Sequence, residues 1–253
     1  MTDILSNDLK GKRVLITGSS RGIGAAAARA FAEAGARVML HAHATLAPAE
    51  ALAKEIGAVG VMQGDFTDMD QVRRVVAGAI DKLGGLDVLI NNAGTMVGRK
   101  RLSELTDEFI SQVFDLNTRS AIMASQAAYS ALKESRGCII NTVSIASRTG
   151  GSMGSGMYAA SKGFLSTYTH GLAVELSPDQ IRVNGVSPGT IMTDFHRRYT
   201  TPERLANIAK AVPLGRLGTD EDCVGAYLFL ASNALSCYMT GQILEVNGGQ
   251  LMP

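Results

Sequence analysis

Two side chains that together could move a proton lie four residues apart in the stretch MYAASKG, residues 157–163: Tyr158 and Lys162. Residues with this spacing share one face of a helix, which places an ammonium group one turn beyond a phenol. Free tyrosine titrates near pH ~10, and a unit charge at about 4 Å in an effective dielectric of about 20 is worth roughly 4 kcal/mol. The spacing therefore predicts that Lys162 lowers the pKa of Tyr158 into a range useful for acid–base catalysis. The competing interpretation is an ordinary helix face, because lysine is a good helix former.

A glycine-rich turn, TGSSRGIG at residues 17–24, follows an apolar strand pattern and precedes a helical one. Glycine permits positive φ and close approach of the backbone to a ligand, and a helix N-terminus offers unpaired N–H groups and partial positive charge. The turn therefore predicts a phosphate or pyrophosphate site, with a tight turn that binds no ligand as the alternative. It is not a Walker P-loop, because no Gly-Lys-Ser/Thr follows, and its G-x3-G-x-G spacing differs from the usual G-x-G-x-x-G.

Three further stretches accompany this turn along the chain. They are NNAG at 91–94, Ser144 with YAASK at 158–162, and SPG at 187–189. Together with TGSSRGIG, these motifs make the sequence resemble the short-chain dehydrogenase/reductases, which are NAD(P)-dependent enzymes built on one Rossmann-type domain. The resemblance covers nearly the whole chain, because the closing stretch GQILEVNGG at 241–249 also resembles the last strand of that family. One such motif is a weak signal, whereas four in family order are hard to obtain by chance.

The resemblance implies a role for each of four polar side chains. Tyr158 gives a proton to a carbonyl oxygen as hydride arrives, or removes it in the reverse reaction. Lys162 also holds the nicotinamide ribose, Ser144 hydrogen-bonds the substrate oxygen, and Asn117 in DLNTRS holds a proton-relay water. The implied substrate is a small carbonyl compound or alcohol.

The position of the serine departs from the family pattern. Ser144 lies 14 residues before Tyr158, one more than the commonest family spacing, whereas Ser147 lies 11 before it. The strand pattern IINTVS favours Ser144, with the extra residue placed in the following TGGSMGSG loop. We interpret Ser147 as a loop hydroxyl that bonds nearby backbone.

The end of the second strand bears on cofactor choice. Family members that use NAD carry an acidic residue there, which bonds the adenosine ribose. Here the strand ends LHAHAT, so Ala42 takes the acidic position and His43 follows it, while Arg21 adds a second basic group. The resemblance therefore favours NADP(H), with NAD(H) as the alternative. His41 and His43 share a strand face, but no further ligands lie near them in sequence, so we expect no metal site.

The resemblance also assigns residues along the whole dinucleotide. Asp65 resembles the aspartate that contacts adenine, although a helix N-cap is its competing interpretation and Asp68 fits that role better. The full set of dinucleotide residues is Gly18, Ser20, Arg21, Gly22, Ile23, Gly24, His43, Asp65, Phe66, Asn92, Ala93, Gly94, Tyr158, Lys162, Pro188, Gly189, Ile191 and Thr193.

Two other classes of function compete with this interpretation. GGSMG at 150–154 fits the G-x-S-x-G elbow of serine hydrolases, with Ser152, Asp194 and His196 in the right order. That elbow needs a strand ending at the serine and a helix starting directly after it, which the pattern here does not predict. The second competitor is a non-catalytic NADP-binding sensor on the same fold. Such a sensor would bind dinucleotide without turning over any carbonyl or alcohol.

The elements that must position these residues alternate between short apolar runs and helical patterns. We expect strands at 12–17, 36–41, 59–63, 86–91, 137–144, 181–187 and 242–247, and helices at 24–35, 48–56, 68–84, 107–132 and 158–176. Strands separated by helices predict right-handed crossovers and a parallel sheet covered on both faces. The fold class is therefore α/β, a doubly wound Rossmann-type sheet of about seven parallel strands in one domain, 1–253. Residues 190–216 interrupt the pattern and, by the resemblance, form a lid over the substrate.

Bulk composition excludes some partners. The 253 residues carry a formal net charge of +1, which argues against nucleic acid or an anionic membrane as the main partner. No signal peptide or membrane span is expected, and three scattered cysteines fit a cytoplasmic protein. The apolar stretch from GAYLFLAS onward is a candidate for subunit contacts, and the resemblance implies a homotetramer.

Overall fold

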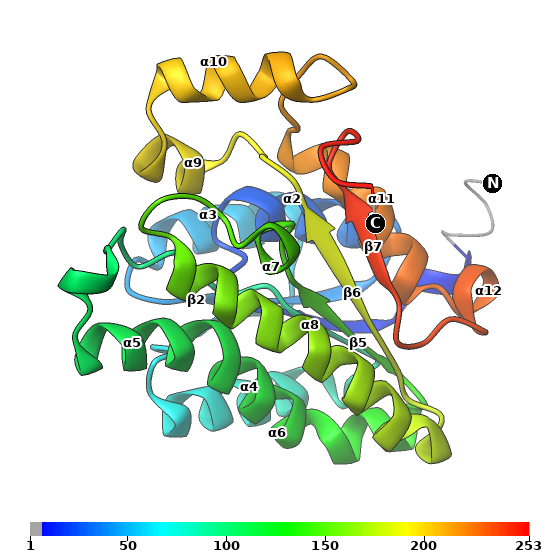
Figure 1. Cartoon of the computed structure of the whole chain (residues 1–253). Helices are drawn as coiled ribbons and strands as arrows, with labels where there is room; N and C mark the ends of the chain where they lie inside the picture. The colour runs from blue at the N-terminus through cyan, green and yellow to red at the C-terminus, as the bar shows by residue number, and fades with distance from the viewer. Residues whose placement is uncertain (1–6, 253) are drawn as a thin grey trace.

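One parallel β-sheet forms the centre of the computed structural model, which describes residues 7–252. Its strands are β1 (Arg13–Ile16), β2 (Arg37–Ala42), β3 (Gly60–Gln63), β4 (Val88–Asn91), β5 (Cys138–Thr142), β6 (Arg182–Pro188) and β7 (Ile243–Val246). The seven strands lie in the order β3-β2-β1-β4-β5-β6-β7, and all neighbouring pairs are parallel. The predicted Rossmann-type sheet is confirmed (Figure 1).

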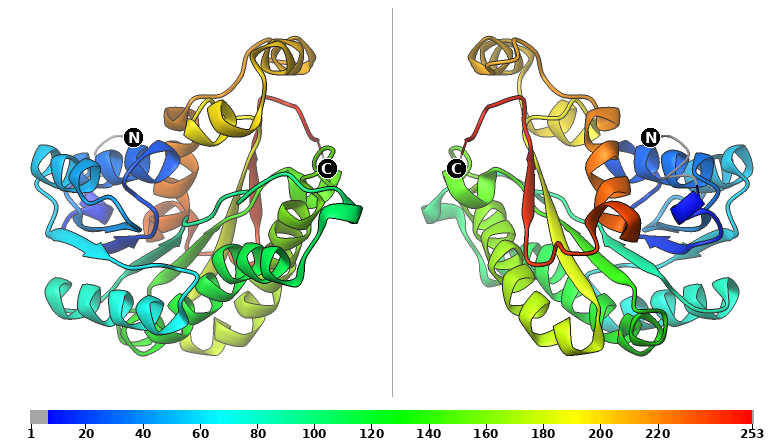
Figure 2. Two further views of the ribbon diagram at one scale, coloured as in Figure 1. Left: turned by 90° about the vertical axis from the view of Figure 1, so that its left-hand side faces the viewer. Right: turned by 90° about the vertical axis from the view of Figure 1, so that its right-hand side faces the viewer.

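Helices cover both faces of the sheet. The longer ones are α2 (Gly22–Glu33), α3 (Ala47–Ile56), α4 (Met69–Leu83), α5 (Asp107–Phe114), α6 (Ser120–Ser135), α8 (Gly156–Leu176), α10 (Pro202–Ala211) and α11 (Asp220–Ala231), and the short ones are α7 (Ala146–Thr149), α9 (Asp194–Tyr199) and α12 (Asn233–Ser236). Figure 2 shows α2, α3 and α11 on one side of the sheet and α4, α6 and α8 on the other. Among residues 7–252, no helix has both the length and the apolarity needed to cross a membrane.

The two faces divide the core by the alternation of strand side chains. Val14 and Ile16 of β1 pack in one hydrophobic cluster with Phe31 of α2, while Leu15 packs in the other with Val76 of α4. Successive strand residues point to opposite faces, so a strand buried on both sides is apolar throughout. This arrangement fixes the carboxyl ends of the strands, where the predicted site residues lie.

The C-terminal apolar stretch proves to belong to this core. Residues of GAYLFLAS lie in α11, which packs against α2, and Tyr227 is fully buried. The Tyr227 hydroxyl lies 2.7 Å from Oγ1 of Thr142 at the end of β5. Leu228 and Phe229 of α11 are only partly buried, so the expectation that this stretch also makes subunit contacts stays a prediction.

The helix predicted over 107–132 is interrupted. After α5 the chain forms a π-helical turn, Asp115–Arg119, before α6 continues to Ser135. Side chains there bond backbone carbonyls one turn earlier: Asn117 Nδ2 donates to Val113 O at 2.9 Å, and Ser120 Oγ to Leu116 O at 2.6 Å. Such bonds compete with the regular helical ladder, and π turns of this kind are frequent at functional sites.

The segment predicted as a lid contains α9 and α10, which lie above the carboxyl ends of the strands in Figure 1. Its ends are pinned together, because Ile191 pairs with Gly218 in an isolated parallel bridge. The Gly218 N–H donates to Thr190 O at 3.1 Å, and the Met192 N–H donates to Gly218 O at 2.8 Å. Residues 190–218 thus form a closed loop over the sheet.

Candidate active site

A cavity of about 820 Å³ runs along the carboxyl ends of the strands and beneath α9. This edge is where open parallel sheets bind ligands. Its lining includes every predicted dinucleotide residue, namely Gly18, Ser20, Arg21, Gly22, Ile23, Gly24, His43, Asp65, Phe66, Asn92, Ala93, Gly94, Tyr158, Lys162, Pro188, Gly189, Ile191 and Thr193, together with Ser144. Asn117 does not line the cavity and lies directly behind Gly94.

The glycine-rich turn packs tightly against the segment that follows β4. Gly18 has φ +63°, and a Cβ placed on it would lie 2.8 Å from the Cα of Ala93. A Cβ on Gly24 would lie 2.5 Å from Asn92 Nδ2 and 2.6 Å from Gly18 O. Thr17 joins the two segments, because its Oγ1 accepts from the N–H groups of Asn92 at 2.9 Å and Ala93 at 3.0 Å. Only glycine fits these positions, so the backbone itself forms this wall of the cavity.

His41 anchors the same turn, a role that sequence reasoning missed. Its ring is buried and stacks on Phe66 with 3.9 Å between ring centres. Nδ1 accepts from the Gly18 N–H at 2.9 Å, and Nε2 lies 3.0 Å from Gly64 O, so the bonds select the tautomer with the proton on Nε2. Burial lowers the pKa of His41 to about 4. Both ring nitrogens are thus occupied, while the exposed His43 lies 3.5 Å from Asp65.

Tyr158 and Lys162 lie on one face of α8, as their spacing predicts, but their electrostatics differ from expectation. Lys162 Nζ donates to Thr142 O at 2.8 Å and lies 5.9 Å from the centre of the Tyr158 ring. Burial raises the pKa of Tyr158 to about 12, opposed by a hydrogen bond from Ser144. Burial also lowers the pKa of Lys162 to about 8. The predicted acidification of Tyr158 is therefore wrong in this structure, because desolvation of the phenol dominates and the ammonium faces a carbonyl.

The side-chain oxygen of Asn117 is a hydrogen-bond acceptor without a partner in the described part of the chain, and it lies on the side of Gly94 near Lys162. Asn117 Nδ2 donates to Thr95 O and Val113 O, both at 2.9 Å. Its Oδ1 is buried and has no hydrogen-bond partner among residues 7–252. A Cβ on Gly94 would lie 2.6 Å from that oxygen and 3.1 Å from Lys162 Nζ. The bare face of Gly94 therefore borders both atoms, and a buried acceptor without a partner marks a place where a donor is missing.

Of the two serine candidates, Ser144 is the one that faces the cavity. Its Oγ accepts from the Ala146 N–H at 3.2 Å and also reaches the Tyr158 side chain. Ser147 lies in α7 and is absent from the cavity lining. The structure thus agrees with the strand pattern in choosing Ser144.

Ser152, Asp194 and His196 do not form the catalytic triad that a serine hydrolase would need. The Oγ of Ser152 accepts from the Arg99 guanidinium at 2.9 Å, while His196 Nδ1 lies 3.2 Å from Thr200 Oγ1. Asp194 pairs instead with Arg21 at 3.2 Å. Moreover, β5 ends ten residues before Ser152, so no strand leads into a nucleophile elbow.

The α9 helix places an aromatic wall over the catalytic side of the cavity. The ring of Phe195 lies 5.4 Å from that of Tyr158 and 5.3 Å from that of Tyr199, centre to centre. His196 packs edge-on against Phe195 at 5.1 Å, and burial followed by the charge of Arg99 lowers the pKa of His196 to about 4. A neutral, largely apolar surface thus faces the phenol.

The ends of the predicted dinucleotide site carry two contacts between a basic and an acidic side chain. Arg21 lies 3.2 Å from Asp194, and His43 lies 3.5 Å from Asp65. Asp65 also accepts from the N–H and the hydroxyl of Thr67, both at 2.8 Å. The helix cap belongs to Asp68, as predicted, because its side chain accepts from the first N–H groups of α4.

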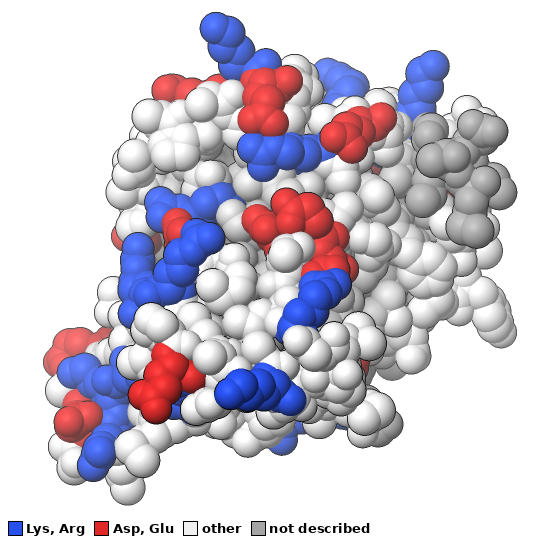
Figure 3. All heavy atoms as spheres, turned by 90° about the horizontal axis from the view of Figure 1, so that it is seen from above, with Lys and Arg blue, Asp and Glu red and all other residues white. Residues whose placement is uncertain are grey.

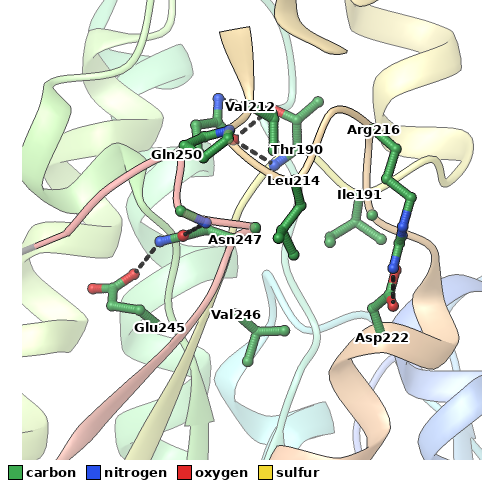
Figure 4. Close-up of a pocket in the computed structure, with 14 residues that line it drawn as sticks. Thr190, Ile191, Val212, Leu214, Arg216, Asp222, Glu245, Val246, Asn247 and Gln250 are labelled. Carbon is green, nitrogen blue, oxygen red and sulfur yellow. Dashed lines mark hydrogen bonds and ion pairs between the residues drawn. The ribbon is translucent and has the colours of Figure 1, made fainter. Parts of the chain in front are cut away.

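A second cavity, of about 470 Å³, lies beyond the last two strands (Figure 4). Its polar side chains are already paired with one another. Arg216 Nη1 lies 2.6 Å from Asp222, Asn247 Nδ2 donates to Glu245 at 3.1 Å, and Gln250 bonds Thr190. Because these polar groups are satisfied, the larger cavity is the candidate active site.

Known proteins share both the sequence and the fold. Residues 18–250 match the protein family described as enoyl-(acyl carrier protein) reductase. The chain is 38% identical over 248 residues to an L-rhamnose 1-dehydrogenase (NAD(P)(+)) of Azotobacter vinelandii, a match that covers 94% of this chain and 96% of that one.

Solved structures superpose closely. An NADH-dependent reductase responsible for alginate metabolism gives a TM-score of 0.88 at 40% identity, with 100% of both chains covered, and it has also been solved in complex with NAD. A blue fluorescent protein from a metagenomic library, solved with NADPH, gives a TM-score of 0.90 at 36% identity over 97% of this chain and 100% of that chain. The cavity, its residues and these likenesses agree: the chain belongs to the short-chain dehydrogenase/reductase family, whose members are oxidoreductases acting on alcohol and carbonyl groups.

Proposed function

We propose that this protein interconverts a carbonyl compound and its secondary alcohol with NADP(H), and that Tyr158 transfers the proton. The observation that carries the proposal is the meeting of Ser144, Tyr158 and Lys162 in one cavity with the glycine-rich turn. The bound dinucleotide would supply or accept the hydride.

The chain fits a dinucleotide at this edge of the sheet. Gly18 and Gly24 leave no room for a side chain, so backbone N–H groups at the start of α2 are free to face a pyrophosphate. Asn92, Ala93 and Gly94 would line the ribose and nicotinamide portion, and Pro188 to Thr193 its carboxamide side.

Tyr158 is suited to act as an acid. With a pKa raised to about 12, its phenol is protonated at neutral pH and available to a developing alkoxide. Ser144 would hydrogen-bond the same substrate oxygen and hold it next to the phenol. In the oxidative direction the tyrosine must first lose its proton, so we expect oxidation to favour alkaline pH.

Lys162 and Asn117 complete a path for the replacement proton. Lys162 Nζ donates to Thr142 O, and Asn117 Oδ1 has an unused lone pair beside the bare face of Gly94. A water molecule in that space would donate to Asn117 and accept from the ammonium. Along this path a replacement proton would reach the phenol of Tyr158.

The preference for NADP(H) is supported by the end of β2. Ala42, the last residue of that strand, offers no carboxylate to the adenosine ribose, and the exposed His43 follows it. Arg21 lies at the edge of the same cavity. A 2′-phosphate would therefore meet basic groups rather than a carboxylate at the end of this strand.

Steady-state assays of Tyr158→Phe beside the wild type test the proposal. Across a panel of ketones, aldehydes and alcohols, the wild type should show a higher kcat/KM with NADPH than with NADH. The variant should lose about 10² to 10⁴-fold in kcat, because only the transferable proton is removed.

Binding of NADPH, followed by its fluorescence, serves as the control and should be unchanged in the variant. Wild-type turnover by Tyr158→Phe would contradict the proton-transfer role. Dinucleotide binding by the wild type without turnover of any compound would indicate a non-catalytic sensor instead.

A further inference from the structure

We propose that three arginines, Arg99, Arg198 and Arg204, form a binding site for an anionic group of the substrate, so that the preferred substrates are oxo or hydroxy compounds bearing a carboxylate or a phosphate. This assignment of substrate class rests on the function proposed above. It concerns the end of the cavity remote from the glycine-rich turn.

The three side chains come from separate segments and line the same cavity. Arg99 follows the NNAG segment after β4, Arg198 lies in α9, and Arg204 lies in α10. Figure 3 shows this face from above, with several basic side chains on its left and acidic side chains among them. Convergence from three elements on one hollow is expected of a binding site and is not explained by the packing of any one helix.

Arg99 is held in place by neutral acceptors only. Its Nε donates to Tyr199 O at 2.9 Å, and its Nη1 donates to Ser152 Oγ at 2.9 Å and Met153 O at 3.0 Å. Within residues 7–252, its Nη2 has no hydrogen-bond partner. The guanidinium is thus fixed between α9 and the loop before α8, and one donor group stays available to an anion.

No carboxylate balances this charge. Across the described part of the chain, none lies within 4.0 Å of Arg99, Arg198 or Arg204. The acidic residues that line the cavity, Asp65 and Asp194, have basic partners of their own. By contrast, exposed arginines elsewhere, such as Arg29 and Arg216, lie 2.6 Å from carboxylates.

The positive charges also act on one another. Burial, and after it the charge of Arg204, lowers the pKa of the Arg99 guanidinium. Together with burial, the charge of Arg99 keeps His196 neutral by lowering its pKa to about 4. The positive charges of the three arginines repel one another, and a bound anion would offset this repulsion. Their combined electric field would also attract an anionic ligand to the cleft.

The site lies next to the reacting groups. Arg99 is bonded to Tyr199 and Ser152, and the aromatic wall formed by Phe195 connects Tyr199 to Tyr158. An anion on the arginines would therefore hold one end of a small molecule while its carbonyl faces Tyr158. Such an anchor fixes orientation as well as affinity.

The test compares substrates matched for shape but not for charge. With NADPH, levulinate (4-oxopentanoate) is assayed against its methyl ester, and dihydroxyacetone phosphate against dihydroxyacetone. The wild type should prefer the charged member of at least one pair by tenfold or more in kcat/KM, mainly through KM. The carboxylate pair and the phosphate pair tell which anion the site accepts.

Arg204→Gln and Arg198→Gln should each reduce that preference about tenfold, through a higher KM for the charged compound, while the affinity for NADPH stays unchanged. Arg204→Lys should recover part of the preference, because it restores the charge. Lys210→Gln, which removes an exposed charge from α10 outside the cavity, serves as the matched control. Equal activity on charged and neutral members of both pairs would overturn the proposal.

Binding without turnover separates this proposal from the proposed function. Calorimetric titration of malonate into the NADP-loaded protein should show binding that Arg204→Gln weakens about tenfold. If the wild type reduces nothing yet binds malonate in this way, the anion site stands and the catalytic proposal fails. If the wild type reduces neutral carbonyls and binds neither malonate nor inorganic phosphate, the catalytic proposal stands and the anion site fails.

Discussion

At the scale of single residues, burial decides the protonation of the catalytic group. Tyr158 stays a neutral phenol because desolvation raises its pKa to about 12, and Lys162 turns its ammonium to the carbonyl of Thr142. A four-residue spacing places two side chains on one helix face, but it does not say which other acceptors they meet. The spacing of Tyr158 and Lys162 therefore predicted that they share a face, but it gave the wrong direction for the pKa shift of Tyr158.

The same limit explains which site residues escaped sequence reasoning. Glycines and the Tyr–Lys spacing belong to local motifs, so they could be recognised from the chain alone. Arg99 and His41 act through partners far away in sequence: Arg99 bonds Tyr199, and His41 bonds Gly18 and Gly64. The alternation His41-Ala42-His43 drew attention to these histidines. Without the fold, however, it suggested only two possible metal ligands and not the hydrogen bonds of His41 to the glycine-rich turn.

His41 gives a prediction for stability against pH. Its folded pKa of about 4 lies below the ordinary 6.5, so the unfolded chain binds the additional proton as pH falls. The stabilisation from this group is complete above pH 6.5 and is lost as pH falls towards 4. Between pH 7 and pH 5 we expect a loss on the order of 2 kcal/mol in the free energy of unfolding.

The comparison with His41→Asn isolates this contribution. Asparagine can accept from the Gly18 N–H but does not titrate, so the variant should be less stable at pH 7 and should lose less stability on acidification. Urea unfolding at pH 7 and pH 5 gives the change in the free energy of unfolding with pH for each protein. The contributions of other titrating groups, such as His196, are the same in both proteins and cancel in the comparison. An identical slope for both proteins would contradict the assignment.

At the scale of elements, strands and glycine turns were the predictable parts. A buried apolar run between turn signals is unambiguous here, so all seven strands fall where the pattern places them. The π turn at Asp115–Arg119 was not predicted, because no glycine or proline between Asp107 and Ser135 marks a break in the helical pattern. It depends on individual side-chain bonds such as that of Asn117 to Val113 O.

Gly24 gives a prediction at the junction of two elements. A methyl group there would lie 2.5 Å from Asn92 Nδ2 and 2.6 Å from Gly18 O, so Gly24→Ala must push the first turn of α2 away from the glycine-rich turn and from the loop after β4. We expect a loss of about 1–3 kcal/mol in stability and at least tenfold weaker binding of NADPH. Thermal unfolding and fluorescence titration measure the two effects.

Gly225→Ala is the control within a helix. Gly225 lies in α11 and a Cβ there meets nothing within 4 Å, so alanine should be neutral or stabilising by about 0.5–1 kcal/mol. If Gly24→Ala behaved like Gly225→Ala, the close packing described for the turn would be wrong.

At the scale of the whole molecule, general rules of crossover handedness predict a parallel sheet covered on both faces, but they do not predict subunit contacts. The outer face of α8 nevertheless carries a marked stripe: Ala160, Phe164, Thr167, Gly171 and Val174 are all exposed and uncharged, with spacings of four and three residues. Such a stripe suits close packing against a second helix. The stripe is a candidate for one symmetric contact of the homotetramer that the resemblance implies, and that assembly stays a prediction.

Light scattering coupled to size-exclusion chromatography tests this assembly. The wild type should elute as a tetramer, and Thr167→Arg should reduce the mass because it places charges opposite each other across a symmetric contact. Asn207→Arg on α10, an exposed position away from the stripe, should leave the mass unchanged. A monomeric wild type, or an unaffected Thr167→Arg, would count against the α8 interface.

The cavity is bordered by Gly18 near one end of the chain and by Gln250 near the other. Gln250 Oε1 accepts from the Thr190 N–H at 3.1 Å, so the base of the loop over the sheet is secured by a side chain that lies beyond β7. The loop over the active site is therefore anchored at its base by a residue outside every helix and strand. Loss of the Gln250 side chain would free that loop while leaving Ser144, Tyr158 and Lys162 in the chain.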